Sequence, residues 1–252
     1  MADLPEVSLY AIPASHPCFA VEEQLKLKQL PYKVVELPMF VSKLHQKVVF
    51  GRSTVPAIKV NGVRVVGSHE IPHVLDSLVP EPRLFPADPA DRARIEEIDQ
   101  WGDDVLQSIA RHVSLAAAAS DPVVAMSYQQ GAKFAVPAPI AKTLGPTIVG
   151  VYKKTLGASD DQVRTDIAQL PEALNKVDAW INEGLLGQAT PNAADLQIGS
   201  SIALLQTVED LAPIFAGHCA VKLGERFRKY NKGHAPTGSL PPEWLAVATP
   251  VS

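Results

Sequence analysis

Residues 53–71 read STVPAIKVNGVRVVGSHEI. Two runs rich in β-branched residues, 57–60 and 63–66, flank Asn61-Gly62, a dipeptide that tolerates the positive φ angles of a tight hairpin turn. The pattern therefore predicts two antiparallel strands. Pro56 lacks an amide hydrogen, so it belongs at a strand start or on a sheet edge, with either a trans bond or a cis bond that would turn the Val55 backbone outward.

A helix start is predicted directly after the second strand. Ser68 follows that strand, and Glu70 and Ile71 come next, an order that suits a serine capping the first turn of a helix. Free N–H groups at such a start favour an anion. The stretch is thus interpreted as strand, hairpin, strand and an anion-receptive helix start.

The residues before this stretch predict a strand, a helix and a second strand. Residues 7–12 and 32–37 are strand candidates, and between them Cys18, Val21 and Leu25 recur at helical spacing after Pro17. A helix between two strands predicts a parallel pair, so the whole sheet should be mixed.

A change of composition predicts a domain boundary. Residues 79–93 contain four prolines, which should prevent regular structure. Beyond them no strand alternation is found, and helices are expected within 94–119, 159–183 and 192–211. Asn192 and Asp195 have the spacing of a capping box. We predict domains at 1–80 and 94–252, joined by a proline-rich linker at 81–93.

Bulk composition excludes several classes of protein. The 252 residues carry a formal charge of -4, so the chain shows no net electrostatic attraction to nucleic acid or to an anionic membrane. Two cysteines, Cys18 and Cys219, form no disulfide framework and no zinc spacing, and we expect no metal. Neither a secretory signal nor a membrane span is predicted, which favours the cytoplasm. The basic residues at 222–232 are interpreted as a solvated helix face.

The order of these motifs resembles the cytosolic glutathione transferases over nearly the whole chain. That resemblance implies a thioredoxin-like β-α-β-α-β-β-α domain with a mixed sheet, followed by an all-α domain. It rests on four motifs, which are Ser15 in ASHPCFAV, Val55-Pro56 in STVPAI, Gly67-Ser68 in GSHEI, and NAADL at 192–196.

The resemblance also implies roles for single residues. Val55, before cis Pro56, would offer its backbone to the cysteinyl part of glutathione, and Ser68 would receive the γ-glutamyl carboxylate. Ser15 takes the position of the catalytic serine in the serine-type classes, where a hydroxyl stabilises the thiolate. Gly67 departs from the family, which has Glu or Gln there to help bind the glutamyl group. Candidates for the glycyl carboxylate are Lys43, Lys47 and Arg52.

Several nearby residues have alternative interpretations. Ser15 without the family context would be only a helix cap. Cys18 is interpreted as a buried helix cysteine because the first cysteine of a Cys-x-x-Cys pair is missing. His16 is expected to be exposed, and Tyr10 to be a packed strand aromatic. His69 with His73 is interpreted as a solvated or dimer-facing pair, since no third metal ligand is in sight.

We expect a homodimeric transferase that adds the glutathione thiolate, its co-substrate, to an apolar electrophile, a detoxification reaction. The helices at 101–119 and 126–152 should supply the acceptor pocket, with Arg111, His112 and Tyr128 as candidates. The rival hypothesis is a non-catalytic binding or interaction protein with a weakened glutathione site, which Gly67 favours. A third hypothesis is glutathione-dependent reduction of peroxides or disulfides. It would be favoured by a cysteine at position 15, where this chain has serine.

Overall fold

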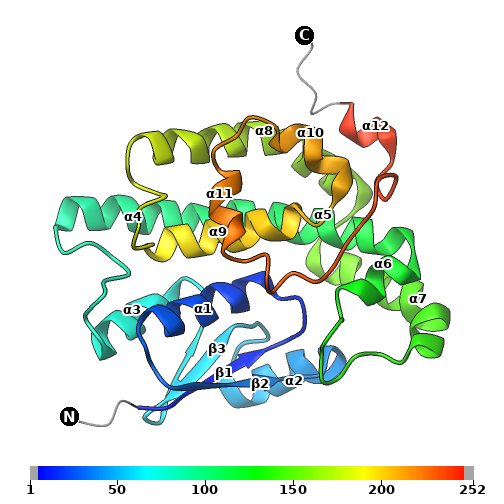
Figure 1. Ribbon diagram of the computed structural model, residues 1–252. Coiled ribbons are helices and arrows are strands. Elements are labelled where there is room, and N and C mark those ends of the chain that lie inside the picture. Colours follow the sequence, from blue (N-terminus) through cyan, green and yellow to red (C-terminus); the bar gives the residue numbers. More distant parts are fainter. Residues whose placement is uncertain (1–4, 247–252) are drawn as a thin grey trace.

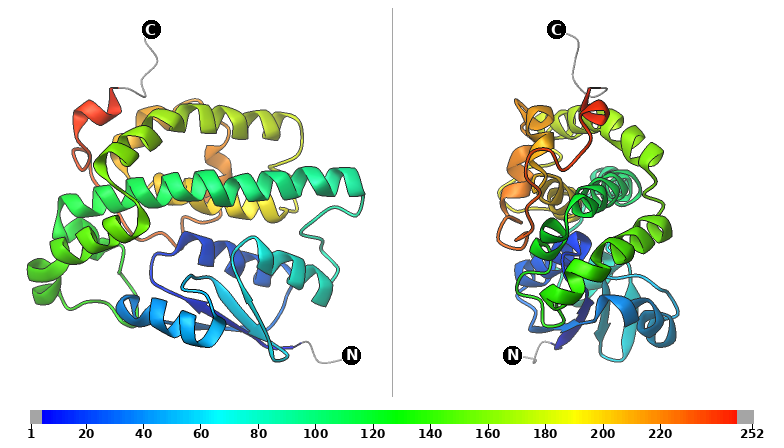
Figure 2. Two further views of the ribbon diagram at one scale, coloured as in Figure 1. Left: turned by 180° about the vertical axis from the view of Figure 1, so that it is seen from behind. Right: turned by 90° about the vertical axis from the view of Figure 1, so that its right-hand side faces the viewer.

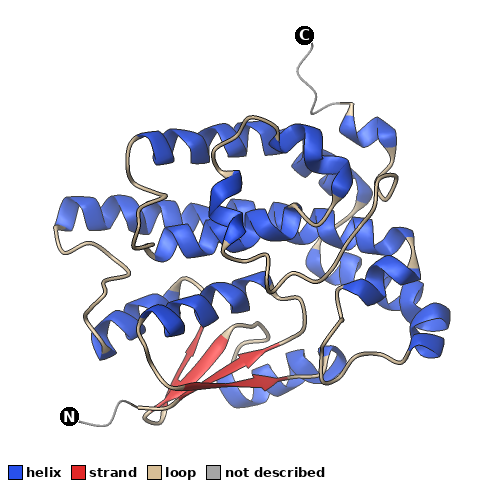
Figure 3. Cartoon of the chain, viewed as in Figure 1, coloured by secondary structure: helices blue, strands red, loops and turns tan. Residues whose placement is uncertain are grey.

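The computed structural model describes residues 5–246, in which a four-stranded sheet and its helices lie beneath a larger helical part (Figure 1). Every strand lies in the first 66 residues of the chain, and the described residues that follow are helices and loops (Figure 3). This arrangement confirms a thioredoxin-like first part followed by an all-α part.

The sheet is mixed, as predicted. Its order is β2-β1-β3-β4, with β1 parallel to β2 and with β1–β3 and β3–β4 antiparallel. Asn61 and Gly62 adopt φ angles of 49° and 79°, the positive values that a two-residue hairpin loop needs. The strands are β1 (Val7–Ala11), β2 (Tyr32–Glu36), β3 (Ala57–Val60) and β4 (Val63–Val66).

Three helices cover this sheet: α1 (His16–Leu27), α2 (Met39–Phe50) and α3 (Glu70–Leu78). Helices α1 and α3 lie between the sheet and the helical part (Figure 1). On β1 the buried Leu9 joins the main core, whereas Tyr10 points to the other face and packs on His45 and Phe50 of α2, with ring centroids 5.7 and 4.9 Å away. Tyr10 is therefore a packed strand aromatic, as expected.

The helical part is built around α9 (Ala193–Leu205), whose residues are all buried. The predicted capping box is present, because Asn192 accepts from the Asp195 amide and Asp195 accepts from the Asn192 amide. Over residues 5–246 no helix has both the length and the hydropathy needed to cross a bilayer. The other helices are α4 (Pro89–Trp101), the π-helical turn η1 (Gly102–Leu106), α5 (Gln107–Ser120), α6 (Pro122–Ser127), α7 (Ala138–Leu156), α8 (Asp160–Asn182), the 3-10 turn η2 (Glu209–Leu211), α10 (Ala212–Phe215), α11 (Val221–Glu225) and α12 (Pro242–Leu245).

Two predicted helix boundaries are wrong, both near prolines. Helix α4 begins at Pro89, inside the expected linker, because Asp88 caps it and proline is well suited to a first helical turn. The single helix expected at 126–152 is interrupted between Ser127 and Ala138, where Gly131 has a φ of 85°. Proline at a helix start and glycine at a break are the usual boundaries.

The basic residues near α11 are not simply solvated. Arg226 and Lys229 approach Glu23 of α1 at 3.6 and 2.9 Å, and Tyr230 donates to the same carboxylate. The C-terminal segment is therefore attached to α1 by charge, which corrects the interpretation from sequence.

Candidate functional site

The register of the sheet brings three chain segments to one edge. Ala57 at the start of β3 lies opposite both Tyr10 of β1 and Val66 of β4. The residues after β1, before β3 and after β4 therefore meet. The Gly67 amide donates to the Pro56 carbonyl at 3.0 Å, which fixes the contact between two of these segments.

Val55 presents an unpaired backbone at this edge. The Val55–Pro56 bond is cis, as predicted. Among the described residues, neither the Val55 amide nor its carbonyl has a hydrogen-bond partner. Because unpaired backbone groups favour a partner, this edge suits the backbone of an extended peptide-like ligand.

Ser15 stands at the start of α1, but its side chain does not cap the helix. Its Oγ instead accepts from the Cys18 thiol at 3.1 Å, so the helix-cap interpretation does not describe it. No described residue accepts the Ser15 hydroxyl hydrogen, which is therefore available to a ligand. Cys18 is buried, as predicted, and burial raises the pKa of its thiol to about 12, which keeps it protonated and unreactive.

His16 is buried, and the expectation that it is exposed is wrong. Its Nε2 has no hydrogen-bond partner, and burial, together with the positive charge of Arg111, holds the pKa of the imidazole well below its usual value. The reason lies in tertiary packing, since the main contact of α1 in the helical part is the buried helix α9. His16 is accordingly a neutral side chain.

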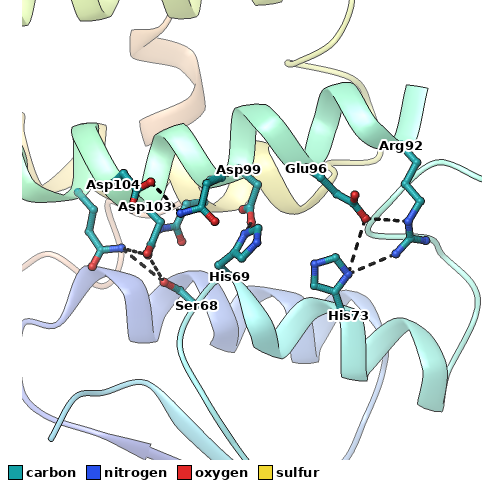
Figure 4. Close-up of polar contacts among 11 residues, drawn as sticks. Ser68, His69, His73, Arg92, Glu96, Asp99, Asp103 and Asp104 are labelled. Carbon is teal, nitrogen blue, oxygen red and sulfur yellow. Dashed lines mark hydrogen bonds and ion pairs between the residues drawn. The ribbon is translucent and has the colours of Figure 1, made fainter. Parts of the chain in front are cut away.

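Ser68 is only 3% exposed and reaches from the start of α3 into the helical part (Figure 4). Its hydroxyl donates to Asp103 Oδ1 at 2.9 Å. The predicted serine cap is absent, because α3 starts at Glu70 with no side-chain cap. Within residues 5–246 no acceptor pairs with the amides of Ser68 or His69, so the predicted anion-receptive helix start is open.

Asp103, in the π-helical turn η1, is a site residue that sequence reasoning missed. Its Oδ1 accepts from Ser68, from Gln107 Nε2 at 2.5 Å and from Gln197 Nε2 at 3.1 Å. Its Oδ2 takes no hydrogen bond from any described residue, and this atom is not fully buried. A carboxylate oxygen is thus accessible beside Ser68. In the sequence, the only feature that could have pointed to Asp103 is the acidic pair Asp103-Asp104. In the structure, the π-helical turn is a second indication, because such turns are frequent at functional sites.

The same network includes Arg111, one of the three predicted acceptor residues. Arg111 Nη2 donates to Gln107 Oε1 at 2.5 Å, and Gln107 in turn donates to Asp103. The guanidinium is close enough to His16 to lower the pKa of that imidazole. Arg111 is therefore connected to Ser68 through Gln107 and Asp103, and its charge acts on His16 at the start of α1.

His112 and Tyr128 make contacts in other parts of the molecule. The ring nitrogens of His112 pair with Asp166 Oδ2 at 2.7 Å and with the Leu156 carbonyl at 2.9 Å. Tyr128 shares a 2.7 Å hydrogen bond with Thr207, and burial raises the pKa of its phenol. Packing among helices accounts for both side chains, and the structure does not bring them together with Arg111.

His69 and His73 are not a solvated pair, because both contact α4 (Figure 4). His69 Nδ1 lies 2.5 Å from Asp99 Oδ2, and this hydrogen bond raises the pKa of His69. Burial raises the pKa of Asp99 to about 6. His73 stacks on Phe85, with centroids 4.3 Å apart. No cluster of His, Cys, Asp and Glu side chains among the described residues could hold a metal ion.

Lys43 lies in the first half of α2, which starts at the same sheet edge. The Leu37 amide donates to the Ala11 carbonyl at 2.8 Å, and α2 follows directly. The Lys43 ammonium lies 6.0 Å from the ring centroid of Tyr152. Its assignment to the glycyl carboxylate stays a prediction.

Comparison with known proteins agrees with this geometry. Residues 9–83 match a family model described as glutathione S-transferase, N-terminal domain. No curated protein matches the sequence significantly. The match over residues 9–83 confirms the predicted resemblance to that family.

Solved structures extend the likeness to the whole fold. A glutathione S-transferase from Rhodospirillum rubrum F11 is 17% identical, with a TM-score of 0.59 over 96% of this chain and 100% of that one. Poplar glutathione transferase F1 is 14% identical, with a TM-score of 0.61 over 96% of each chain. Maleylacetoacetate isomerase from Anaeromyxobacter dehalogenans 2CP-1, solved with glutathione in its active site, is 18% identical, with a TM-score of 0.55 over 93% of this chain and 99% of that one. The chain has the glutathione S-transferase fold.

Proposed function

We propose that this protein binds glutathione at the sheet edge and transfers its thiolate to an apolar electrophile. The observation that carries the proposal is that the three chain segments that meet there bear unused groups: the Val55 backbone, the Ser15 hydroxyl hydrogen and the amides of Ser68 and His69. Each suits one part of the ligand, namely the cysteinyl backbone, the thiolate and the γ-glutamyl carboxylate. Glutathione bound in the related isomerase fold supports this assignment.

Ser15 acts on the thiol by donating its hydroxyl hydrogen to the sulfur. A hydrogen bond to the charged form, together with the N-terminus of α1, lowers the thiol pKa and raises the fraction of thiolate at neutral pH. Ser15 is the donor, and glutathione supplies the nucleophile. The Cys18 thiol donates to the Ser15 oxygen at 3.1 Å, which leaves the hydroxyl hydrogen of Ser15 free for the sulfur of glutathione.

Asp103 replaces the missing side chain at position 67. The glutamyl group carries a carboxylate and an ammonium, and the two need opposite partners. The amides at the start of α3 suit the carboxylate, whereas the accessible Asp103 Oδ2 suits the ammonium. Gly67 has a φ of 111°, a conformation that glutamate or glutamine would adopt only with strain.

Calorimetric titration with glutathione, followed by conjugation of 1-chloro-2,4-dinitrobenzene at neutral pH, tests the proposal. We expect binding and turnover, and Ser15→Ala should reduce turnover while leaving affinity largely intact. Absence of glutathione binding by the parent protein would refute the proposal.

A non-catalytic binding protein is the second candidate. The Ser68 hydroxyl is already used by Asp103, an observation that favours a partly occupied glutamyl site. Glutathione binding without conjugation of several electrophiles would support this candidate. The homodimer, the cytoplasmic location and the domain limits at 80 and 94 stay predictions in either case.

A further inference from the structure

Arg111 is a half-buried cation on α5 that has no carboxylate partner among the described residues. Its one hydrogen bond within residues 5–246 is the donation from Nη2 to Gln107 Oε1 at 2.5 Å. A guanidinium has five N–H donors, so most of them are left for other acceptors. Burial lowers the pKa of Arg111, because the charged form is less well solvated there than in water. An anionic ligand would stabilise such a side chain.

Asp103 is the carboxylate whose charge acts on Arg111. It precedes Arg111 by about two helical turns, and Gln107 donates to it from between them. In the proposed complex the charge of Asp103 has another partner, because its Oδ2 is assigned to the glutamyl ammonium of glutathione. Binding of glutathione would therefore compensate Asp103 and leave the positive charge of Arg111 for a second anion.

The position of Arg111 relates it to the candidate site. Two hydrogen-bonded side chains connect it to Ser68 at the start of α3. Its charge also acts on His16, which adjoins Ser15 at the start of α1. Figure 2 shows the long helical run from α4 to α5, teal to green, crossing above α1 and α3. The cation is thus associated with two of the three chain segments that form the candidate site.

We propose that Arg111 binds a carboxylate of the acceptor, so that the electrophile is an organic acid with an otherwise apolar body. The inference rests on the proposed function, in which Ser15 holds the thiolate of glutathione. A carboxylate matches the planar fork of a guanidinium with two parallel hydrogen bonds, which also fix the orientation of the bound molecule. The electrophilic carbon is then presented to the sulfur beside Ser15. For a chloroarene the sulfur forms a C–S bond, the C–Cl bond breaks, and chloride leaves with the bonding electrons.

A pair of electrophiles that differ in charge tests the inference: 4-chloro-3-nitrobenzoate and 4-chloro-3-nitrobenzamide. The kcat/KM of each is measured with saturating glutathione and divided by the rate of its uncatalysed reaction with glutathione, which removes the difference in intrinsic reactivity. We expect the corrected values to favour the benzoate. Arg111→Gln keeps an amide donor for Gln107 but removes the charge, and it should lower the ratio of benzoate to benzamide by about tenfold to a hundredfold. Arg111→Lys, which keeps the charge without the fork, should restore part of the preference.

Arg94→Gln is the matched control, because Arg94 is an exposed arginine of α4 that pairs with Glu183. It should leave the ratio unchanged. The inference is overturned if the parent protein does not favour the benzoate, or if Arg111→Gln leaves the ratio at its parent value. Equal effects of Arg94→Gln and Arg111→Gln also overturn it, since the cause is then the net charge of the protein.

An unreactive ligand separates this inference from the proposed function. 3-Nitrobenzoate has no leaving group, so its binding, followed by ligand-observed NMR, needs no conjugation. We expect the parent protein to bind it, and Arg111→Gln to weaken binding about tenfold or more. Conjugation of neither chloroarene, nor of 1-chloro-2,4-dinitrobenzene, refutes the proposed function, and the 3-nitrobenzoate titration then decides the anion site alone. Conjugation of both chloroarenes without binding of 3-nitrobenzoate overturns the assignment of Arg111 and leaves the transferase activity standing.

Discussion

Replacing Asp103 with asparagine removes one negative charge beside Ser68 and keeps the size of the side chain. The three donors to Oδ1, from Ser68, Gln107 and Gln197, are all neutral, so an amide oxygen still accepts them. What changes is the accessible Oδ2 position, where an NH₂ group would face the glutamyl ammonium. A hydrogen bond to a charged group contributes about 1.5–3 kcal/mol. Glutathione should therefore bind roughly tenfold to a hundredfold more weakly.

The assay compares two ligands by calorimetry: glutathione and its analogue in which hydrogen replaces the α-amino group. Asp103→Asn should weaken binding of glutathione and leave the analogue nearly unaffected, because only glutathione has the ammonium. Asp104→Asn is the control, since Asp104 is exposed and its Oδ2 accepts from Gln100 at 2.8 Å. Equal effects on both ligands, or equal effects of the two substitutions, would refute the role of Asp103. Failure of the parent protein to bind either ligand would instead refute the proposed function.

Four further predictions concern chemistry and stability. Ser15→Ala should raise the pKa of the bound thiol, which would shift the pH–rate profile to higher pH. The substitution should raise the activation barrier by at most about 2.7–4 kcal/mol. Gly67→Glu should lower the free energy of unfolding by about 1–3 kcal/mol without tightening glutathione binding. The reason is that residue 67 has a φ of 111°, which glutamate adopts only with strain. Asn192→Ala should cost about 0.5–2 kcal/mol in urea unfolding, since it removes the cap of α9. The pKa of His69 is raised in the folded state, so its stabilising contribution is complete below the unfolded pKa and is lost as pH rises through the folded one. The difference in unfolding free energy between the parent and His69→Gln should accordingly shrink as the pH rises above about 6.5, and a constant difference would contradict the pairing with Asp99.

The hairpin and the cap of α9 were predictable because their signals are local. Asn61-Gly62 fixes a turn between adjacent strands, and Asn192 with Asp195 closes a box within one helical turn. Asp103 was not predictable, since it lies 35 residues from Ser68 and their hydrogen bond leaves no periodic pattern. His16 illustrates the same limit, because its burial depends on packing between α1 and the helical part.

The proposed ligand would connect two parts of the chain whose backbone amides are protected from hydrogen exchange to different degrees. Ser68 lies on a short link between β4 and α3, whereas Asp103 is held by Gln197 of α9, a helix buried along its whole length. Amides in such a helix exchange with deuterium only when the protein opens globally, while links at a sheet edge exchange by local opening. Bound glutathione would thus connect a locally opening segment to Asp103, a residue that is held by the buried helix α9. Its clearest signature should be slower deuterium uptake at residues 67–70, with little change in α9.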